Sequence, residues 1–426
     1  MTTRKDKIFY ICNELYNNSA GSFRQERWIN VMLEKGFDVT VLLVLNSIRV
    51  SKITYSSKEE FSIDVKHKRH IIKAKRSVKH GFFAKFGRFC KHVFLVEFFF
   101  PSQIILFYLL YKEIRSKKSI SIFVSSPPFS LAFVAGILKY LAPKKTYLSV
   151  DMRDPWALHW ALGGIKLLRK KIESFVLKNA DSVSTVSEHI KHLFESTYQI
   201  NVSLQYNIAT HINNISEIPD SCILNSNFGA FRFPENDVCS IVYTGSTSEG
   251  FYDLISVSNS INIFYEMYNK IEKRIIFYFI GSCDNLKNLI NPNHIENGLV
   301  KFISHLPHSE IKCIQKNATL LFFLAHNVKG NGGYITTKIF EYFAMKKPVL
   351  AYGVENNSEI NRVFLKFCNS TINIQTSNDF YCLLQRIDEN RSFINELPIM
   401  NNESNFDLLE KSYFEEIEKF KRLKIE

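Results

Sequence analysis

The sequence predicts an α/β protein with two Rossmann-like domains, each built on a doubly wound parallel sheet. At 426 residues the chain is longer than one ordinary hydrophobic core supports. It is 46% hydrophobic and 22% charged, which is typical of globular proteins. In both halves, short apolar runs alternate with amphipathic segments at helical spacing, and this alternation indicates parallel strands joined by helices.

The first half contains the clearest run of alternating elements. We expect strands at 8–12, 39–44, 121–125, 146–150 and 182–186, and helices at 23–35 and 131–140. Trp28, Val31 and Met32 recur at helical spacing in the first of these helices. Gly36 follows it and is a typical helix stop. These elements define a first domain at residues 1–210.

The second half repeats the scheme after a polar segment. We expect strands at 240–244, 274–280, 300–303, 319–324 and 348–351, with helical segments between them. Residues 211–237 include Pro219 and Pro234 and are rich in turn-forming residues, so we expect a linker that leads into the second domain, 238–405. The last segment, 406–426, predicts a helix that can pack back on the first domain.

Composition and motifs narrow the class of protein. The first seven residues are polar, and the next apolar run is too short for a secretory signal, so we expect a cytoplasmic protein. The eight cysteines lack the spacing of metal ligands or a disulfide framework, so we expect them to be core residues. Because Gly-x-Gly-x-x-Gly, a Walker-type loop and an Asp-x-Asp in a suitable context are absent, we expect no cofactor and no metal.

The net charge of +13 favours anionic partners. Basic residues crowd into 66–91, where they alternate with phenylalanines, and an apolar run follows at 93–111. Polar residues and a proline interrupt that run, which makes it a poor membrane span. We expect contact with an anionic membrane surface, the alternative being an ordinary helix surface packed on the first domain. No motif supports nucleic-acid binding, and we expect none.

The strongest candidate site is the segment 337–348. A Gly-rich loop at 330–333 precedes it, and Thr336 and Thr337 are suitable residues to cap the helix that follows. Lys338 and Glu341 are three residues apart and share a helix face. A helix N-terminus suits a diphosphate, and a carboxylate one turn along can accept hydrogen bonds from both hydroxyls of a ribose. The alternative is an exposed Lys–Glu pair on an amphipathic helix.

Five segments resemble motifs of family 4 glycosyltransferases with the GT-B fold, and they occur in the family's order. They are the loop and helix start from Gly21, residues 151–156 after 125–128, residues 180–188, residues 241–245, and residues 337–351. The resemblance runs from about residue 8 to residue 361. It implies two domains facing a cleft, an acceptor-side first domain and a donor-binding second domain. It also implies that Glu341 holds the donor ribose.

Two departures from the family pattern concern the donor diphosphate. The family commonly has two Glu residues separated by seven others, and here Gly333 occupies the first position. The segment 245–250, which begins with Gly245 and Ser246, lacks the usual Arg and Lys. Lys338, Lys329 or loop N–H groups must then meet the diphosphate charge. A chain with these losses can also be inactive.

Three charged residues, Asp151, Arg153 and Asp154, follow a predicted strand at its carboxyl end. One interpretation makes Arg153 and Asp154 catalytic and places Asp151 on the acceptor side with Gly21 and His159. The other is an internal Arg–carboxylate pair that fastens the loop, with the next proline and tryptophan packing beneath it.

The resemblance therefore implies a retaining, metal-independent glycosyltransferase of the hexosyltransferase type. We expect a nucleotide-diphosphate sugar as donor and a saccharide, lipid-linked, as acceptor. The setting would be surface polysaccharide biosynthesis, at the inner face of the cytoplasmic membrane. The alternatives are a nucleotide-sugar 2-epimerase on the same fold and a non-catalytic partner subunit.

Overall fold

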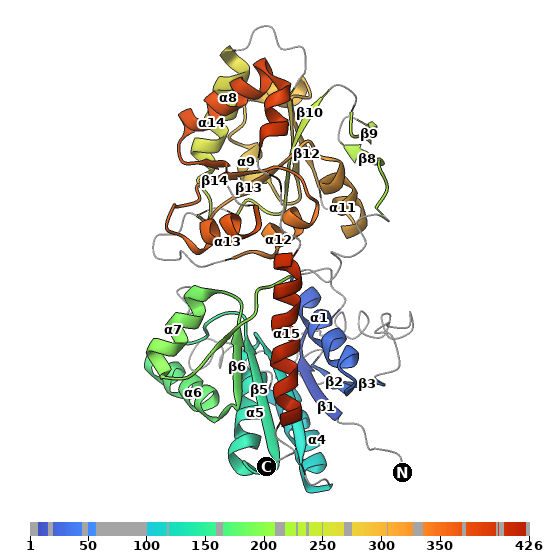
Figure 1. The fold of residues 1–426 in the computed structure, drawn as a ribbon, viewed down its shortest axis with the longest axis vertical. Coiled ribbons are helices and arrows are strands. Elements are labelled where there is room, and N and C mark those ends of the chain that lie inside the picture. The colour runs from blue at the N-terminus through green and yellow to red at the C-terminus, as the bar shows by residue number, and fades with distance from the viewer. Residues whose placement is uncertain are drawn as a thin grey trace. The chain divides into compact units, whose positions relative to one another are not determined.

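The structure is a computed structural model, and its chain divides into two compact units. It describes residues 7–15, 20–44, 50–56, 100–116, 119–158, 165–208, 218–226, 229–235, 238–248, 250–267, 275–304, 306–326, 335–368, 372–397, 399 and 404–422. The first unit contains Met1–Thr210 and Leu408–Glu426, and the second contains His211–Asp407. Figure 1 shows the elements of each unit.

The first unit is built on a sheet whose described strands run in the order β3-β2-β1-β4-β5-β6-β7. Their bounds are β1 (Lys7–Cys12), β2 (Asp38–Val44), β3 (Val50–Tyr55), β4 (Ile120–Ser126), β5 (Thr146–Met152), β6 (Ser182–Thr185) and β7 (Ser203–Leu204). Of these, β3 alone pairs antiparallel to its neighbour. The strand order reverses between β1 and β4, which is where doubly wound sheets bind ligands. All strands predicted in this half are confirmed.

Helices cover both faces of the first sheet. They are α1 (Ala20–Glu34), α4 (Phe100–Ser116), α5 (Phe129–Leu141), α6 (Lys166–Asn179), α7 (Glu188–Tyr198) and α15 (Ser404–Arg422). Successive side chains of β4 point to opposite faces of the sheet. Ile122 and Val124 lie in the core made with α4 to α7, whereas Phe123 packs against Trp28 of α1 and Phe420 of α15. The last helix therefore packs on the first unit, beside α1 (Figure 1).

Local signals explain where several helices begin and end. Gly36 takes a left-handed φ of 86° after α1, which is the predicted stop. The Ser187 hydroxyl caps α7 by accepting from the Ile190 N–H at 3.2 Å. Thr376 and Asp379 form a reciprocal capping box at the start of α14. These ends are therefore specified by side chains next to them in the sequence.

The second unit has a parallel sheet whose described strands run in the order β12-β11-β10-β13-β14-β15. The strands are β10 (Cys239–Thr244), β11 (Ile275–Ile280), β12 (Val300–Ile303), β13 (Leu320–Leu324), β14 (Val349–Tyr352) and β15 (Ile372–Ile374). The strands predicted in this half are confirmed, and β15 was not predicted. Residues 211–237, expected as a linker leading into the second domain, belong to this unit. They include the hairpin β8 (Cys222–Ser226) and β9 (Gly229–Phe233).

The helices of the second unit pack on the two faces of its sheet. They are α8 (Leu254–Met267), α9 (Asp284–Lys287), α10 (Pro292–Glu296), α11 (His308–Asn317), α12 (Thr337–Ala344), α13 (Glu359–Cys368), α14 (Ser377–Glu389) and the short 3-10 helix η2 (Arg391–Glu396). Phe380 of α14 packs on Phe277 and Phe322 on one face. Phe343 and Phe364 pack between α12 and α13 on the other. This packing places the start of α12 beside the carboxyl end of β10.

Two further expectations concern cysteines and membrane spans. The cysteines that the structure describes are free, and most are buried, as expected for core residues. Within the described part of the chain, no helix has the length and apolar character needed to cross a membrane.

Candidate functional site

In the second unit, the candidate residues gather at the carboxyl ends of β10 and β13, where the strand order reverses. Gly245 follows β10 directly and has a φ of +134°, a conformation that favours glycine. A Cβ at Gly245 would overlap the Nζ of Lys338. Glycine at this position therefore leaves room for the Lys338 ammonium against the end of the strand.

Lys338 is a half-buried ammonium in the first turn of α12. Its Nζ lies 4.1 Å from the centroid of the Tyr243 ring and makes no hydrogen bond to any residue that the structure describes. Burial lowers the pKa of Lys338 to about 8, while the Glu341 carboxylate acts in the opposite direction. Because a poorly solvated charge without a hydrogen-bond acceptor is costly, Lys338 is well suited to an anionic ligand.

Hydrogen bonds hold the second turn of α12 against β10. The Tyr342 hydroxyl accepts from the Thr244 N–H at 3.0 Å, and the Gln315 amide donates to the Thr244 hydroxyl at 2.9 Å. The Tyr243 hydroxyl donates to the Ser246 carbonyl at 2.7 Å and so shapes the loop after β10. The bonds of Thr244 tie α11 and α12 to the end of β10, and the bond of Tyr243 shapes the loop beside Lys338.

Glu341 lies one turn further along α12, with its side chain 18% exposed. The Nε2 of His308, the first residue of α11, is 3.9 Å from its Oε1. Lys312, one turn along α11, also faces it: burial lowers the Lys312 pKa, and the Glu341 carboxylate opposes that shift. The carboxylate is therefore flanked by two basic side chains from a neighbouring helix.

Of the two threonines expected as possible caps, Thr336 and Thr337, the first occupies the N-cap position. Thr336 is the N-cap residue of α12, and its side chain makes no capping hydrogen bond. Thr337 is the first helical residue and is 6% exposed. The side chain of Thr336 therefore leaves the first turn of α12 without a side-chain cap.

His326 lies just beyond the end of β13 and was not predicted as a site residue. Its Nε2 is 3.1 Å from the Tyr252 hydroxyl, and the rings of Phe251 and Tyr252 meet it edge-on. Burial lowers the pKa of His326, and the nearby Lys338 lowers it further. A neutral imidazole thus lies near the ammonium. The sequence signal that could have revealed His326 is its position as a polar residue directly after the apolar run 320–325.

Three candidate positions lie outside the residues that the structure describes. They are Gly333 and Lys329, in and before the Gly-rich loop, and His159 on the acceptor side. The basic stretch 66–91 also lies outside them. Their predicted roles remain predictions.

In the first unit, Asp151 is fully buried and forms a two-point ion pair with Arg24. The Arg24 Nε and Nη2 lie 2.9 and 2.6 Å from the two carboxylate oxygens, and the Ser184 hydroxyl donates to the same carboxylate at 2.8 Å. Arg24 also donates to the Tyr413 hydroxyl of α15 at 2.7 Å. This geometry favours the internal Arg–carboxylate fastener, with Arg24 in the place that the sequence suggested for Arg153.

Arg153 and Gly21 come together at the carboxyl ends of β1, β4 and β5. The Arg153 Nη2 donates to the Pro127 carbonyl at 3.1 Å. A Cβ at Gly21 would overlap the Arg153 guanidinium and would lie 2.9 Å from the Glu14 carboxylate. Gly21 therefore permits a close approach that any side chain would block, and Asp154 lies half-buried beside Arg153 in the chain.

The loop after Asp154 is fastened by a buried glutamate that the sequence did not reveal. Glu173 of α6 accepts from the backbone N–H groups of Trp156 at 2.7 Å and Ala157 at 3.2 Å. Burial raises the pKa of Glu173, and a hydrogen bond from Tyr198 opposes that shift. The Trp156 ring stacks on Phe129 at 4.3 Å, as the loop-fastening interpretation expects.

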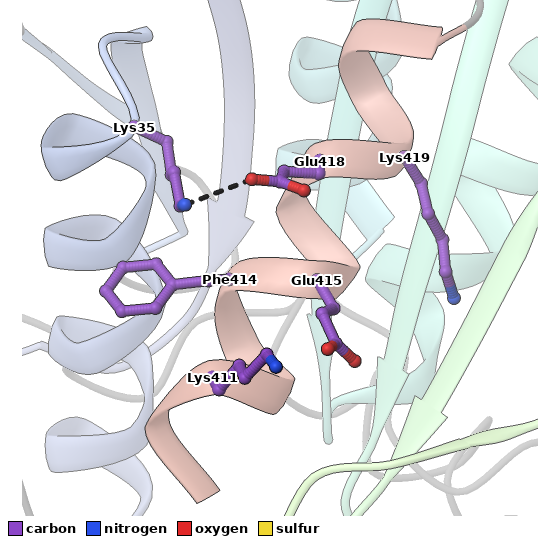
Figure 2. Close-up of a pocket in the computed structure, with 6 residues that line it drawn as sticks. All are labelled: Lys35, Lys411, Phe414, Glu415, Glu418 and Lys419. Carbon is purple, nitrogen blue, oxygen red and sulfur yellow. Dashed lines mark hydrogen bonds and ion pairs between the residues drawn. The ribbon is translucent and has the colours of Figure 1, made fainter. Parts of the chain in front are cut away.

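A separate hollow lies between α1 and α15 (Figure 2). It is lined by Lys35, Lys411, Phe414, Glu415, Glu418 and Lys419. Lys35 pairs with Glu418 at 3.1 Å, and Lys419 pairs with Glu416. Because its charges are mixed and partly paired, this hollow does not favour one class of ligand.

The described residues contain no group of His, Cys, Asp or Glu side chains placed to hold a metal ion. A scan of protein-family models and a search of curated proteins find no match to the sequence.

Solved structures match nearly the whole chain. The N-terminal domain of trehalose-6-phosphate phosphatase from Candida albicans gives a TM-score of 0.55 at 11% identity, covering 98% of this chain and 94% of that one. The α,α-trehalose-phosphate synthase from Burkholderia vietnamiensis gives 0.54 at 8% identity, covering 98% and 96%. Sucrose-phosphate synthase from Thermosynechococcus elongatus gives 0.50 at 10% identity, covering 97% and 94%. The predicted fold class, the GT-B architecture of two Rossmann-like units, is confirmed.

Proposed function

We propose that the protein is a glycosyltransferase that takes its sugar from a nucleotide-diphosphate donor. The observation that carries this proposal is Lys338, an ammonium without a hydrogen-bond partner among the described residues, one helical turn from Glu341. A nucleoside diphosphate presents an anionic diphosphate and a ribose diol together. The ammonium suits the first group, and the carboxylate can accept hydrogen bonds from both hydroxyls of the second.

The transfer breaks the bond between the anomeric carbon and the diphosphate oxygen. The electron pair of that bond leaves with the diphosphate, so negative charge grows beside Lys338 and the N-terminus of α12. The acceptor hydroxyl oxygen forms the new bond to the anomeric carbon, and its proton passes to the departing diphosphate oxygen. His326, close to Lys338 and neutral through its lowered pKa, can donate a hydrogen bond to the leaving group.

Further parts of this proposal rest on the resemblance to family 4 glycosyltransferases. That resemblance supports retention at the anomeric carbon, a hexosyl donor and a saccharide acceptor, lipid-linked, in surface polysaccharide biosynthesis. The absence of a suitable Asp-x-Asp motif supports a mechanism that needs no metal. Gly21, Arg153 and Asp154 are the candidate acceptor-side and catalytic residues of the first unit, and the high net charge supports work at an anionic membrane.

Nucleotide binding tests the donor site directly. Titration calorimetry with UDP, GDP, ADP, dTDP and pyrophosphate should identify at least one nucleotide that binds. Glu341→Ala should weaken that nucleotide by about 10- to 100-fold, because charge-assisted hydrogen bonds to the ribose are lost, and should spare pyrophosphate. Glu355→Ala, at an exposed position of the same unit, is the matched control and should change neither affinity.

Two results would count against this assignment. Binding of no nucleoside diphosphate would remove the enzymatic proposal in favour of a non-catalytic subunit. An unchanged nucleotide affinity in Glu341→Ala would show that the donor site lies elsewhere. Turnover of the donor sugar without any acceptor would instead indicate the 2-epimerase.

A further inference from the structure

Large apolar side chains are exposed mainly on one layer of helices in the first unit. Among the described residues, eight of the fifteen exposed large hydrophobic side chains lie on this layer: Ile104, Ile105, Tyr108, Tyr111, Tyr140, Leu141, Ile165 and Leu167. They belong to α4, to the end of α5 and to the start of α6. Gln103 of α4 bonds Ser130 of α5, and Gly136 of α5 closely approaches Val176 of α6, so the three helices lie side by side.

The arrangement on α4 gives the helix two apolar sides. Leu106, Leu110 and Ile114 are buried in the core of the unit, which accounts for one side. Ile104 and Tyr108, spaced four residues apart, are 55% and 62% exposed on the other. An apolar row that the folded unit leaves in water is unusual and indicates a surface that meets another phase or molecule.

Unpaired cations surround these apolar side chains. The exposed ones are Lys112, Arg115, Lys144, Lys145, Lys166, Lys170, Lys171 and Lys178, and none forms an ion pair with a residue that the structure describes. The carboxylates of the three helices are already engaged: Glu113 pairs with Lys52, and Glu173 is buried beneath Trp156. The surface is therefore cationic as well as apolar.

We propose that the exposed side of α4, the end of α5 and α6, the docking face, binds an anionic membrane surface. Aliphatic side chains enter the boundary between headgroups and acyl chains, tyrosines lie at the headgroups, and Lys and Arg meet lipid phosphates. A second copy of the chain is disfavoured because the two cationic faces would repel each other. Nucleic acid would satisfy the charges but would leave the isoleucines and leucines in water.

This inference deepens the membrane part of the proposed function, but it needs no sugar transfer to be true. The test is flotation of the full chain with vesicles of phosphatidylcholine alone or mixed with phosphatidylglycerol. The chain should float with the mixed vesicles only. Ile104→Ser/Tyr108→Ser should lower the bound fraction about tenfold or more by removing buried apolar area. Lys170→Gln/Lys171→Gln should lower it about 10- to 30-fold in low salt and much less in high salt.

A matched control comes from the second unit. Ile255 and Met267 on α8 are each 65% exposed, so Ile255→Ser/Met267→Ser removes similar apolar surface away from the docking face and should leave flotation unchanged. Equal binding to both kinds of vesicle, no binding to either, or equal effects of the α4 and α8 variants would overturn the proposal. So would a large fall in thermal stability of the α4 variant, since its side chains would then pack against this chain.

Nucleotide titrations on the same samples separate this proposal from the donor site. The α4 variant should keep full nucleotide affinity, and Glu341→Ala should keep full vesicle binding. If no preparation bound vesicles while nucleotide affinity was retained, the docking-face proposal would be contradicted and the donor-site assignment would not be affected.

Discussion

Lys338 makes the candidate donor site sensitive to pH. Its pKa of about 8 is lower than that of an ordinary lysine because burial disfavours the charged form. The ammonium is therefore mostly charged below about pH 8 and loses its charge as the pH rises through that value. A ligand anion would stabilise the charged form, so binding should weaken only on the alkaline side.

The measurement is pyrophosphate affinity as a function of pH. Between about pH 7 and about pH 9 the affinity should fall about tenfold, because only about a tenth of Lys338 stays charged at the higher pH. Lys338→Arg should give a nearly flat profile over this range, since a guanidinium stays charged. A wild-type profile as flat as that of the arginine variant would show that Lys338 does not meet the anion.

His308 is a candidate positioning residue for Glu341. It lies 3.9 Å from the carboxylate and comes from a different helix, so it can hold the side chain for the ribose without touching the ligand. His308→Ala should weaken nucleotide binding about three- to tenfold and spare pyrophosphate. In the double variant with Glu341→Ala the losses should not add, which a double-mutant cycle measures. His192→Ala, at an exposed histidine of α7, is the control.

At the scale of elements, the Arg24–Asp151 pair ties α1, β5 and α15 together. Both side chains are fully buried, so removing one partner leaves an uncompensated charge. Arg24→Met should lower the free energy of unfolding of the first unit by about 3–5 kcal/mol in denaturant titrations. Lys191→Met breaks a partly exposed pair with Glu195 on α7 and should cost less than about 1 kcal/mol. Similar losses in both variants would contradict this account.

Elements differ in how well the sequence predicts them. Central strands such as β10 and β11 are buried on both faces and therefore appear as continuous apolar runs. The edge strand β3 is partly exposed and was missed. Glu341 and Lys338 could be placed together on one helix because helix spacing is local, whereas their roles in donor binding stay a prediction. The pairing of Arg24 with Asp151 joins residues 127 positions apart, and no local pattern specifies such a contact.

A bound nucleotide should stabilise the second unit and leave the stability of the first unit unchanged. Every tryptophan of the sequence (Trp28, Trp156 and Trp160) falls within the first unit, so tryptophan fluorescence reports on that unit. A nucleotide at about 100 times its Kd should stabilise the second unit by about 2.7 kcal/mol. Calorimetry should show this stabilisation of the second unit, while the unfolding midpoint followed by tryptophan fluorescence should not change. A fluorescence shift as large as the calorimetric one would mean that the ligand binds the first unit or that the units unfold together.

The first unit is assembled from two separated pieces of chain, with the second unit lying between them in sequence. On the ribosome, the segment 408–422, which belongs to the first unit, emerges only after all of the second unit has been made. Until then, the side of the first sheet with Trp28 and Phe123 lacks the helix that covers it in the finished protein. The unit whose synthesis begins first is thus completed after the second unit, and until then its uncovered apolar face is open to aggregation and to chaperones.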